Sequence, residues 1–201
     1  ASPFTLSSDE YGYAVNVKYW MPFVYGQGLH DASWQSAFGG NRYKLEECGH
    51  SVHELVTAGI KNARTACDNV KPEALVALDV GPIGQLLEPT GTLSFEEAYE
   101  MYAEIVMAGE AAGADLVVFE TMTDLLDVKA AVLAAKENSS LPVMTTMTFE
   151  ENMRTFTGCQ ISAFALTAAG LGVDALGVNS SLGPKELEPV IAELTQWTNL
   201  P

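Results

Sequence analysis

Residues Val173–Pro184 read VDALGVNSSLGP, and this stretch decides how the rest of the chain is interpreted. Its first half is apolar apart from Asp174, which predicts a short buried strand. The polar cluster Asn179–Ser181 follows directly, and a helical pattern resumes at Lys185. A polar cluster between a strand and a helix lies where α/β proteins place functional groups, although such a loop can also do no more than cap the next helix.

The same strand–helix unit occurs three more times upstream. Further strands are predicted over Ala74–Val80, Asp115–Phe119 and Pro142–Thr148. Helices are predicted over Phe95–Gly109, Leu125–Glu137, Ile161–Ala169 and Glu186–Trp197. Another helix begins after Ser51, which can form a capping box with Glu54. Because each strand is continuously apolar and each helix amphipathic, the pattern predicts a parallel sheet with helices outside it.

The turns between these units favour a barrel over an open doubly wound sheet. No GxGxxG motif follows any strand, which counts against a dinucleotide-binding fold. The phrases AAGAD (111–115) and AAGLGVD (168–174) instead repeat a tight turn before a strand. We therefore predict an α/β protein with a (β/α)8 TIM barrel. A full barrel takes about 250 residues, so in 201 residues we expect an incomplete one, with strands seven and eight absent.

The N-terminal segment does not follow this pattern. Residues 1–37 remain unassigned, and the barrel domain is expected over 38–201. Within the segment, Tyr13–Tyr25 is rich in β-branched and aromatic residues, which predicts one or two strands broken at Pro22.

The composition excludes some partners. The chain has 10 basic and 26 acidic residues and a net charge of −16, so neither nucleic acid nor an anionic membrane is an expected partner. No apolar run reaches the roughly 20 residues that span a bilayer. The three cysteines are odd in number and form no CxxC pair, which favours free thiols in the cytoplasm.

In a barrel, the groups at the carboxyl ends of the strands face one shared pocket. The candidate ligand-binding residues here are Asp79, Gly81, Glu120, Thr148 and Asn179. This acidic, hydroxyl-bearing set suits a ligand with an ammonium group, bound by Glu120 or Asp79. Glu120 could instead cap the next helix, an effect worth ~1 kcal/mol. A carboxylate at a dry strand end is costly without a partner, however, which favours ligand contact.

Four long segments then point to a known family. They are ALDVGPIGQLLEPTG (77–91), GADLVVFETMTDLLDVKAAVLAAK (113–136), PVMTTMTF (142–149) and GVDALGVNSSLGP (172–184). Together they resemble the homocysteine S-methyltransferase family, in the form found at the N-terminus of cobalamin-dependent methionine synthases. The likeness runs in order from about Phe38 to Pro201. It implies a TIM barrel that binds zinc and homocysteine, activates the thiol as a thiolate and methylates it to methionine.

The resemblance also implies roles for single residues. Glu120 matches the glutamate that holds the substrate amino group, and Gly81 lies in the matching Gly-Pro turn. Asn179 matches the asparagine of a G-x-N-C motif, but Ser180 stands where that motif has the first of three zinc-binding cysteines. The other two, a Cys-Cys pair near the eighth strand, have no match here. Cobalamin or folate would act only through modules absent from this chain.

Two alternatives to an active methyltransferase stay open. The chain could be a relative that binds an amino acid without catalysis, or a partial barrel that acts in a larger assembly. An incomplete barrel would leave strand edges unpaired and expose an inner sheet face that includes Met144, Thr146 and Leu176. Such a surface favours pairing with another chain. We therefore expect the chain to form a homo-oligomer, or else to cover its open side with residues 1–37.

We predict that the chain binds zinc weakly or not at all. Tight zinc binding of this family's type needs three deprotonated sulfurs, and position 180 offers only a hydroxyl. Elemental analysis of the purified, dialysed chain measures this. Near-stoichiometric zinc would contradict the prediction and direct attention to Cys48, His50 and His53.

Overall fold

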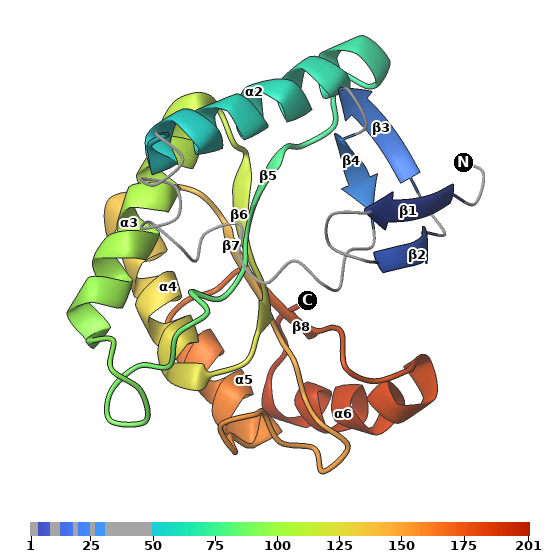
Figure 1. The fold of residues 1–201 in the computed structure, drawn as a ribbon. Coiled ribbons are helices and arrows are strands. Elements are labelled where there is room, and N and C mark those ends of the chain that lie inside the picture. The colour runs from blue at the N-terminus through green and yellow to red at the C-terminus, as the bar shows by residue number, and fades with distance from the viewer. Residues whose placement is uncertain (1–3, 9–12, 18–19, 25–26, 31–49) are drawn as a thin grey trace. The chain divides into compact units, whose positions relative to one another are not determined.

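The computed structural model describes residues 4–8, 13–17, 20–24, 27–30 and 50–201. By its contacts the chain divides into two units, residues 1–35 and residues 36–201. The smaller unit holds two antiparallel pairs of strands (Figure 1). They are β1 (Phe4–Ser8) with β2 (Tyr13–Val17), and β3 (Trp20–Val24) with β4 (Gln27–His30).

Tyr13–Tyr25 thus contains two strands, but the predicted break at Pro22 is wrong. Pro22 lies inside β3 and pairs with Gly28 of β4. A two-stranded pair has an open edge, where a proline that lacks an N–H group interrupts no ladder.

The larger unit contains the four predicted strand–helix repeats. Its sheet consists of β5 (Ala77–Val80), β6 (Leu116–Met122), β7 (Val143–Met147) and β8 (Ala175–Val178). Its helices are α2 (Val52–Val70), α3 (Phe95–Ala112), α4 (Leu125–Asn138), α5 (Ile161–Gly170) and α6 (Pro184–Trp197) (Figure 1). The strands are parallel and their order follows the chain, β5-β6-β7-β8. This confirms an α/β fold with a parallel sheet, without the strand-order reversal of a doubly wound sheet.

The two faces of this sheet differ. The side chains buried against the helices are Leu78, Val80, Val117, Phe119, Val143, Thr145 and Met147. Among the described residues, the opposite face keeps partly or fully exposed side chains, including Asp79, Val118, Glu120, Met144 and Thr146. The sequence predicts Leu176 on this open face, but that prediction is wrong. Leu176 pairs with Thr145, so it points to the helices and packs against the core.

Side-chain caps mark where α2, α3 and α4 begin. The predicted capping box of Ser51 with Glu54 is present at α2, and Ser94 forms a second reciprocal box with Glu97 at α3. The N–H of Leu126 donates to Asp124 Oδ1 at 3.1 Å, so Asp124 caps α4. Glu120 therefore is not the cap of the helix that follows it.

Two aspartates pin the strands at their amino ends. Asp115 donates its N–H to the carbonyl oxygen of Val76, and its Oδ2 accepts the Val76 N–H at 2.7 Å. Asp174 makes the same pair of bonds with Val143, at 2.7 and 2.8 Å. Arg64 binds the Asp115 carboxylate and Lys136 that of Asp174. These bonds explain the repeated Gly-x-Asp phrase of the sequence, since each aspartate sets the register of its strand against the neighbour.

A buried pair fixes the loop that follows β5. Tyr102 donates its hydroxyl to Asp127 Oδ1 at 2.8 Å, and the Ile83 N–H also bonds the pair. Burial raises the pKa of Asp127 to about 6, and the bonds from Tyr102 and Ile83 oppose that rise. The Tyr102 ring packs edge-to-face on Phe119 at 5.5 Å, which ties the loop to the core of the sheet.

None of the helices within the described residues is long and apolar enough to span a bilayer.

We predict that Thr145→Val stabilises the protein. Thr145 is fully buried, and its hydroxyl has no hydrogen-bond partner among the described residues. Replacing that hydroxyl with a methyl group removes a desolvation penalty, so the free energy of unfolding should rise by about 1 kcal/mol. Urea unfolding measures the change. A clear loss of stability would contradict the prediction, because it would mean that the hydroxyl has a buried partner.

Candidate functional site

The sequence-predicted residues gather at the carboxyl edge of the sheet. Asp79 lies in β5 and Glu120 in β6, while Gly81 follows β5, Thr148 follows β7 and Asn179 follows β8. Asp79, Glu120 and Asn179 belong to the partly or fully exposed surface, whereas Thr148 is buried.

The structure brings the side chains of Glu120 and Asn179 together, although the strands they belong to or follow, β6 and β8, are not neighbours. Asn179 Nδ2 donates to Glu120 Oε1 at 3.2 Å and to Thr121 Oγ1 at 2.7 Å. Because β7 separates β6 from β8, the Asn179 side chain reaches over the end of β7 to make these bonds. There its Oδ1 accepts a hydrogen bond from Thr146 Oγ1 at 2.8 Å.

A β-bulge in β6 makes this contact possible. The pairing of β6 with β7 shifts between Phe119, which faces Thr145, and Met122, which faces Met147. In a regular strand Glu120 and Thr121 would point to opposite faces. The extra residue of the bulge lets both side chains approach Asn179. Thr121 adopts a φ of 61°, a conformation that a β-branched residue rarely takes.

The two carboxyl groups of the site influence each other. Desolvation first, and then the charge and hydrogen bond of Glu120, raise the pKa of Asp79 to about 7. The Asp79 residue is nevertheless exposed to solvent, and solvent screens part of its interaction with Glu120. None of the ion pairs formed among the described residues involves Asp79 or Glu120. The edge of the sheet therefore holds two acidic side chains without a basic partner among the described residues, an arrangement that suits a cationic ligand group.

Thr148 and Gly81 lie at the same edge in different roles. Thr148 donates its hydroxyl to the carbonyl oxygen of Asn179 at 3.2 Å, and its N–H to that of Met122 at 2.8 Å. Thr148 thus supports the Asn179 backbone. At Gly81 an added Cβ would meet no described atom within 4 Å, so the surface above this residue is open to a ligand.

The described residues do not fit a zinc site. Ser180 is exposed, has a φ of 60°, and its Oγ accepts a hydrogen bond from Asn179 Nδ2 at 3.3 Å. A serine hydroxyl is a poor zinc ligand beside a thiolate. In the part of the chain that the structure describes, no three His, Cys, Asp or Glu side chains gather around one point. His50 and His53 are exposed there, and Cys48 lies outside the described residues.

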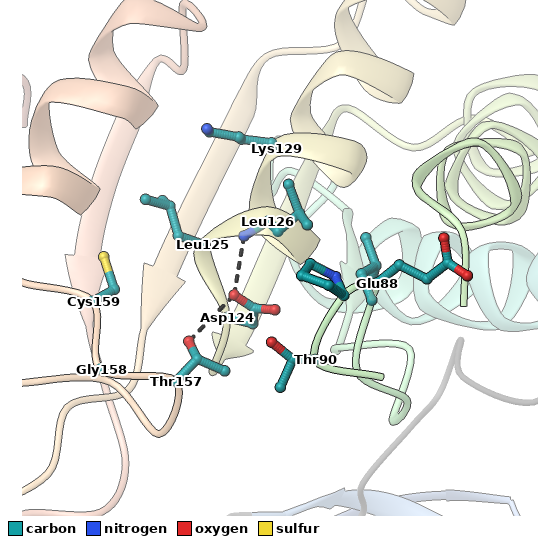
Figure 2. Close-up of a pocket in the computed structure, with 11 residues that line it drawn as sticks. Glu88, Thr90, Asp124, Leu125, Leu126, Lys129, Thr157, Gly158 and Cys159 are labelled. Carbon is teal, nitrogen blue, oxygen red and sulfur yellow. Dashed lines mark hydrogen bonds between the residues drawn. The ribbon is translucent and has the colours of Figure 1, made fainter. Parts of the chain in front are cut away.

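A separate groove of about 440 Å³ lies beside the start of α4 (Figure 2). Its walls come from the loop after β5 (Leu87–Thr90), the first turns of α4 and residues 157–159. Asp124 lies in this groove, where it accepts hydrogen bonds from the Leu126 N–H and from Thr157 Oγ1 at 3.2 Å. The Asp124 carboxylate thus holds a helix and a loop in place.

Fold and site together define a class of protein. Parallel strands joined by helices, with a carboxylate and an amide held at their carboxyl ends, are typical of α/β enzymes that bind small polar ligands. The model of the family described as "Homocysteine S-methyltransferase" matches residues 32–201. The chain therefore belongs to the homocysteine S-methyltransferase family.

Known proteins agree with this assignment. The chain is 28% identical over 181 residues to methionine synthase of Mycobacterium tuberculosis, covering 85% of this chain and 15% of that protein. Methionine synthase of Mycobacterium leprae is 28% identical over 176 residues, covering 83% of this chain and 14% of that protein. The chain thus spans about 15% of the length of the curated relatives it matches.

A solved structure shares the fold. The homocysteine methyltransferase MmuM of Escherichia coli, in its apo form, superimposes with a TM-score of 0.64 at 23% identity. The match covers 85% of this chain and 62% of that one.

Sequence reasoning missed the roles of Thr121 and Thr146. Thr146 was expected on the open sheet face, which the structure confirms, but not as the partner of Asn179. A threonine in a run such as PVMTTMT is indistinguishable from an ordinary strand former. A one-residue bulge likewise leaves no mark in the hydrophobic pattern.

We predict that Asp79→Asn changes how stability depends on pH. The pKa of Asp79 rises from 3.8 to about 7 on folding, so between these values the folded state binds more protons. The free energy of unfolding therefore falls as pH increases through this window. Asparagine cannot ionise, so the variant should be more stable than the wild type at pH 8, with a gain that shrinks towards pH 4. Urea unfolding across this range measures the difference between the two proteins, and a difference independent of pH would contradict the prediction.

Proposed function

We propose that residues 38–201 form the homocysteine-binding domain of a cytoplasmic methyltransferase, built as part of a (β/α)8 barrel. In this proposal Glu120 binds the ammonium group of homocysteine, and Asp79 lies beside Glu120. Asn179 holds the Glu120 carboxylate in place. Gly81 leaves room for the substrate at this edge, and Thr148 contributes indirectly, by supporting the Asn179 backbone. The reaction is the transfer of a methyl group to the substrate sulfur, which gives methionine.

One observation carries this proposal: the Glu120 carboxylate at the edge of the sheet accepts a hydrogen bond from Asn179 Nδ2 and takes part in none of the ion pairs among the described residues. An amide donor does not neutralise a carboxylate, so Glu120 keeps its capacity to accept charge-assisted bonds from an ammonium group. A neighbouring acidic group, Asp79, strengthens the attraction for a cation. The family membership of the chain supplies homocysteine as the amine in question.

Methyl transfer to the substrate sulfur forms one bond and breaks another. The thiol first gives its proton to water. A lone pair of the resulting thiolate then forms the new bond to the methyl carbon, while the bond between methyl and donor breaks and its electron pair leaves with the donor. Holding the amino end fixes the distance from Glu120 to the sulfur, and such positioning is a large part of rate acceleration in transfer reactions.

Ser180 favours a second candidate function, amino-acid binding without methyl transfer. A hydroxyl in place of a thiolate removes a group that would bind a metal ion. Without that ion, the pKa of the substrate thiol is not lowered by metal coordination. The amino end of the site does not depend on this residue. An assay of methyl transfer to homocysteine distinguishes the two functions, since binding alone gives no methionine.

We predict that Glu120→Gln weakens homocysteine binding by about 10- to 100-fold, because a hydrogen bond between an ammonium group and a charged acceptor is worth roughly 1.5–3 kcal/mol. Isothermal titration calorimetry with reduced L-homocysteine on the full chain measures this. The deamino analogue 4-mercaptobutanoate should bind both proteins equally weakly.

A matched control tests whether the effect is local. Glu150 is exposed and follows β7 at the same edge of the sheet, so Glu150→Gln makes the same change of net charge outside the proposed contact. Its affinity should stay within about twofold of the wild type. Equal losses in both variants would point to the general negative field of the chain and would contradict a direct contact at Glu120.

A further inference from the structure

A closed set of hydrogen bonds surrounds the Asn179 amide. Thr146 Oγ1 donates to Asn179 Oδ1 at 2.8 Å, and the same oxygen accepts the Thr121 N–H at 3.0 Å. Asn179 Nδ2 in turn donates to Thr121 Oγ1 and to Glu120 Oε1. Thr146 is thus hydrogen-bonded to Asn179 and to Thr121, the two residues beside Glu120 in this set, but not to Glu120 itself.

Chemistry allows only one orientation of this amide. An ionised carboxylate only accepts hydrogen bonds, so the group facing Glu120 must be the Asn179 NH2. Thr146 has one hydroxyl proton, and because its oxygen already accepts the Thr121 N–H, that proton is available for Asn179 Oδ1. Without the Thr146 hydroxyl, Asn179 Oδ1 loses its donor in this set, and the amide is held through its NH2 group alone.

The backbone supports the same arrangement at a cost. Thr121 and Ser180 both adopt φ values near 60°, and the Oγ of each accepts a bond from Asn179. Non-glycine residues in this region carry strain of order 1–3 kcal/mol each, which persists only where surrounding contacts enforce it. Here the bulge and the turn after β8 place two strained residues around one side chain.

We propose that Thr146 is a positioning residue, which orients the Glu120 carboxylate towards the substrate ammonium group by fixing the Asn179 amide. The inference rests on the proposed function for its ligand, but the orientation itself exists without one. Removing the hydroxyl should leave the Asn179 amide held at its NH2 end only, so the amide turns more freely and orients the Glu120 carboxylate less firmly.

The test uses four variants of the full chain. Thr146→Val removes the hydroxyl, and Thr146→Ala removes it without adding a methyl group, in case the valine variant does not fold. Thr146→Ser keeps the hydroxyl. Thr145→Val is the matched control, because it makes the same substitution one residue away, on the opposite face, at a hydroxyl without a partner.

Two measurements separate positioning from a merely structural effect. The first is the side-chain amide signal of Asn179 in ¹H–¹⁵N spectra of the ligand-free chain, together with its solvent exchange. The second is the dissociation constant for reduced L-homocysteine. Thr146→Val should shift the amide signal, speed its exchange at least tenfold and weaken binding by about tenfold, the effect of one lost hydrogen bond. Thr146→Ser should restore both to within about twofold, and Thr145→Val should change neither.

The outcomes distinguish this inference from the proposed function. If the wild type does not bind homocysteine but the amide signal changes in Thr146→Val and returns in Thr146→Ser, positioning of the Glu120–Asn179 pair stands and its ligand is wrong. If the wild type binds homocysteine and Thr146→Val leaves signal and affinity unchanged, the positioning role is overturned while the proposed function stands. A serine variant that behaves like the valine variant would also overturn it.

Discussion

The register of the parallel strands is the constraint on which the rest of this structure depends. Successive side chains of a strand point to opposite faces, so a slip of one residue would turn Glu120 towards the helices and bury its charge in the core. Asp115 and Asp174 guard against such a slip, since each binds both the N–H and the carbonyl group of one residue on the neighbouring strand. A valine in either place would keep the backbone bond to the carbonyl group but would lose the side-chain bond to the N–H. Charged groups at the amino edge of the sheet thereby determine which groups meet at the carboxyl edge.

The site needs two consecutive side chains of β6 on the same face of the sheet, which a regular strand does not allow. A regular β6 could present Glu120 or Thr121 to the open face, but not both. The bulge between Phe119 and Met122 removes that restriction at the expense of a strained Thr121 backbone. The strain is tolerated because the displaced groups find partners in Asn179 and Thr146. Irregular geometry is therefore confined to the strand end where ligand contact is proposed, while the buried part of the sheet stays regular.

Much of the fold could be predicted because its signals are local. The capping box at Ser51 and the continuous apolar strands mark the boundaries of elements to within a few residues. The meeting of Glu120 with Asn179 was also predictable, because parallel strands bring their carboxyl ends to one edge. The hydrogen bonds that join them were not, since a bulge and a left-handed threonine depend on contacts between β6, β7 and β8. The strands in the first 30 residues were only partly predicted, because a proline at an open edge looks like a strand breaker in the sequence.

The departure at Ser180 separates two tasks that a homocysteine site must combine. Recognition of the amino end needs an oriented carboxylate, and the described residues build one from Glu120, Asn179 and Thr146 without involving position 180 as a donor. Activation of the sulfur needs a cation or base that lowers the thiol pKa, and a serine hydroxyl supplies neither. Because Ser180 only accepts a weak bond from Asn179, exchanging sulfur for oxygen there leaves the recognition network intact. The two tasks are therefore independent in this fold, and a chain can retain the first while altering the second.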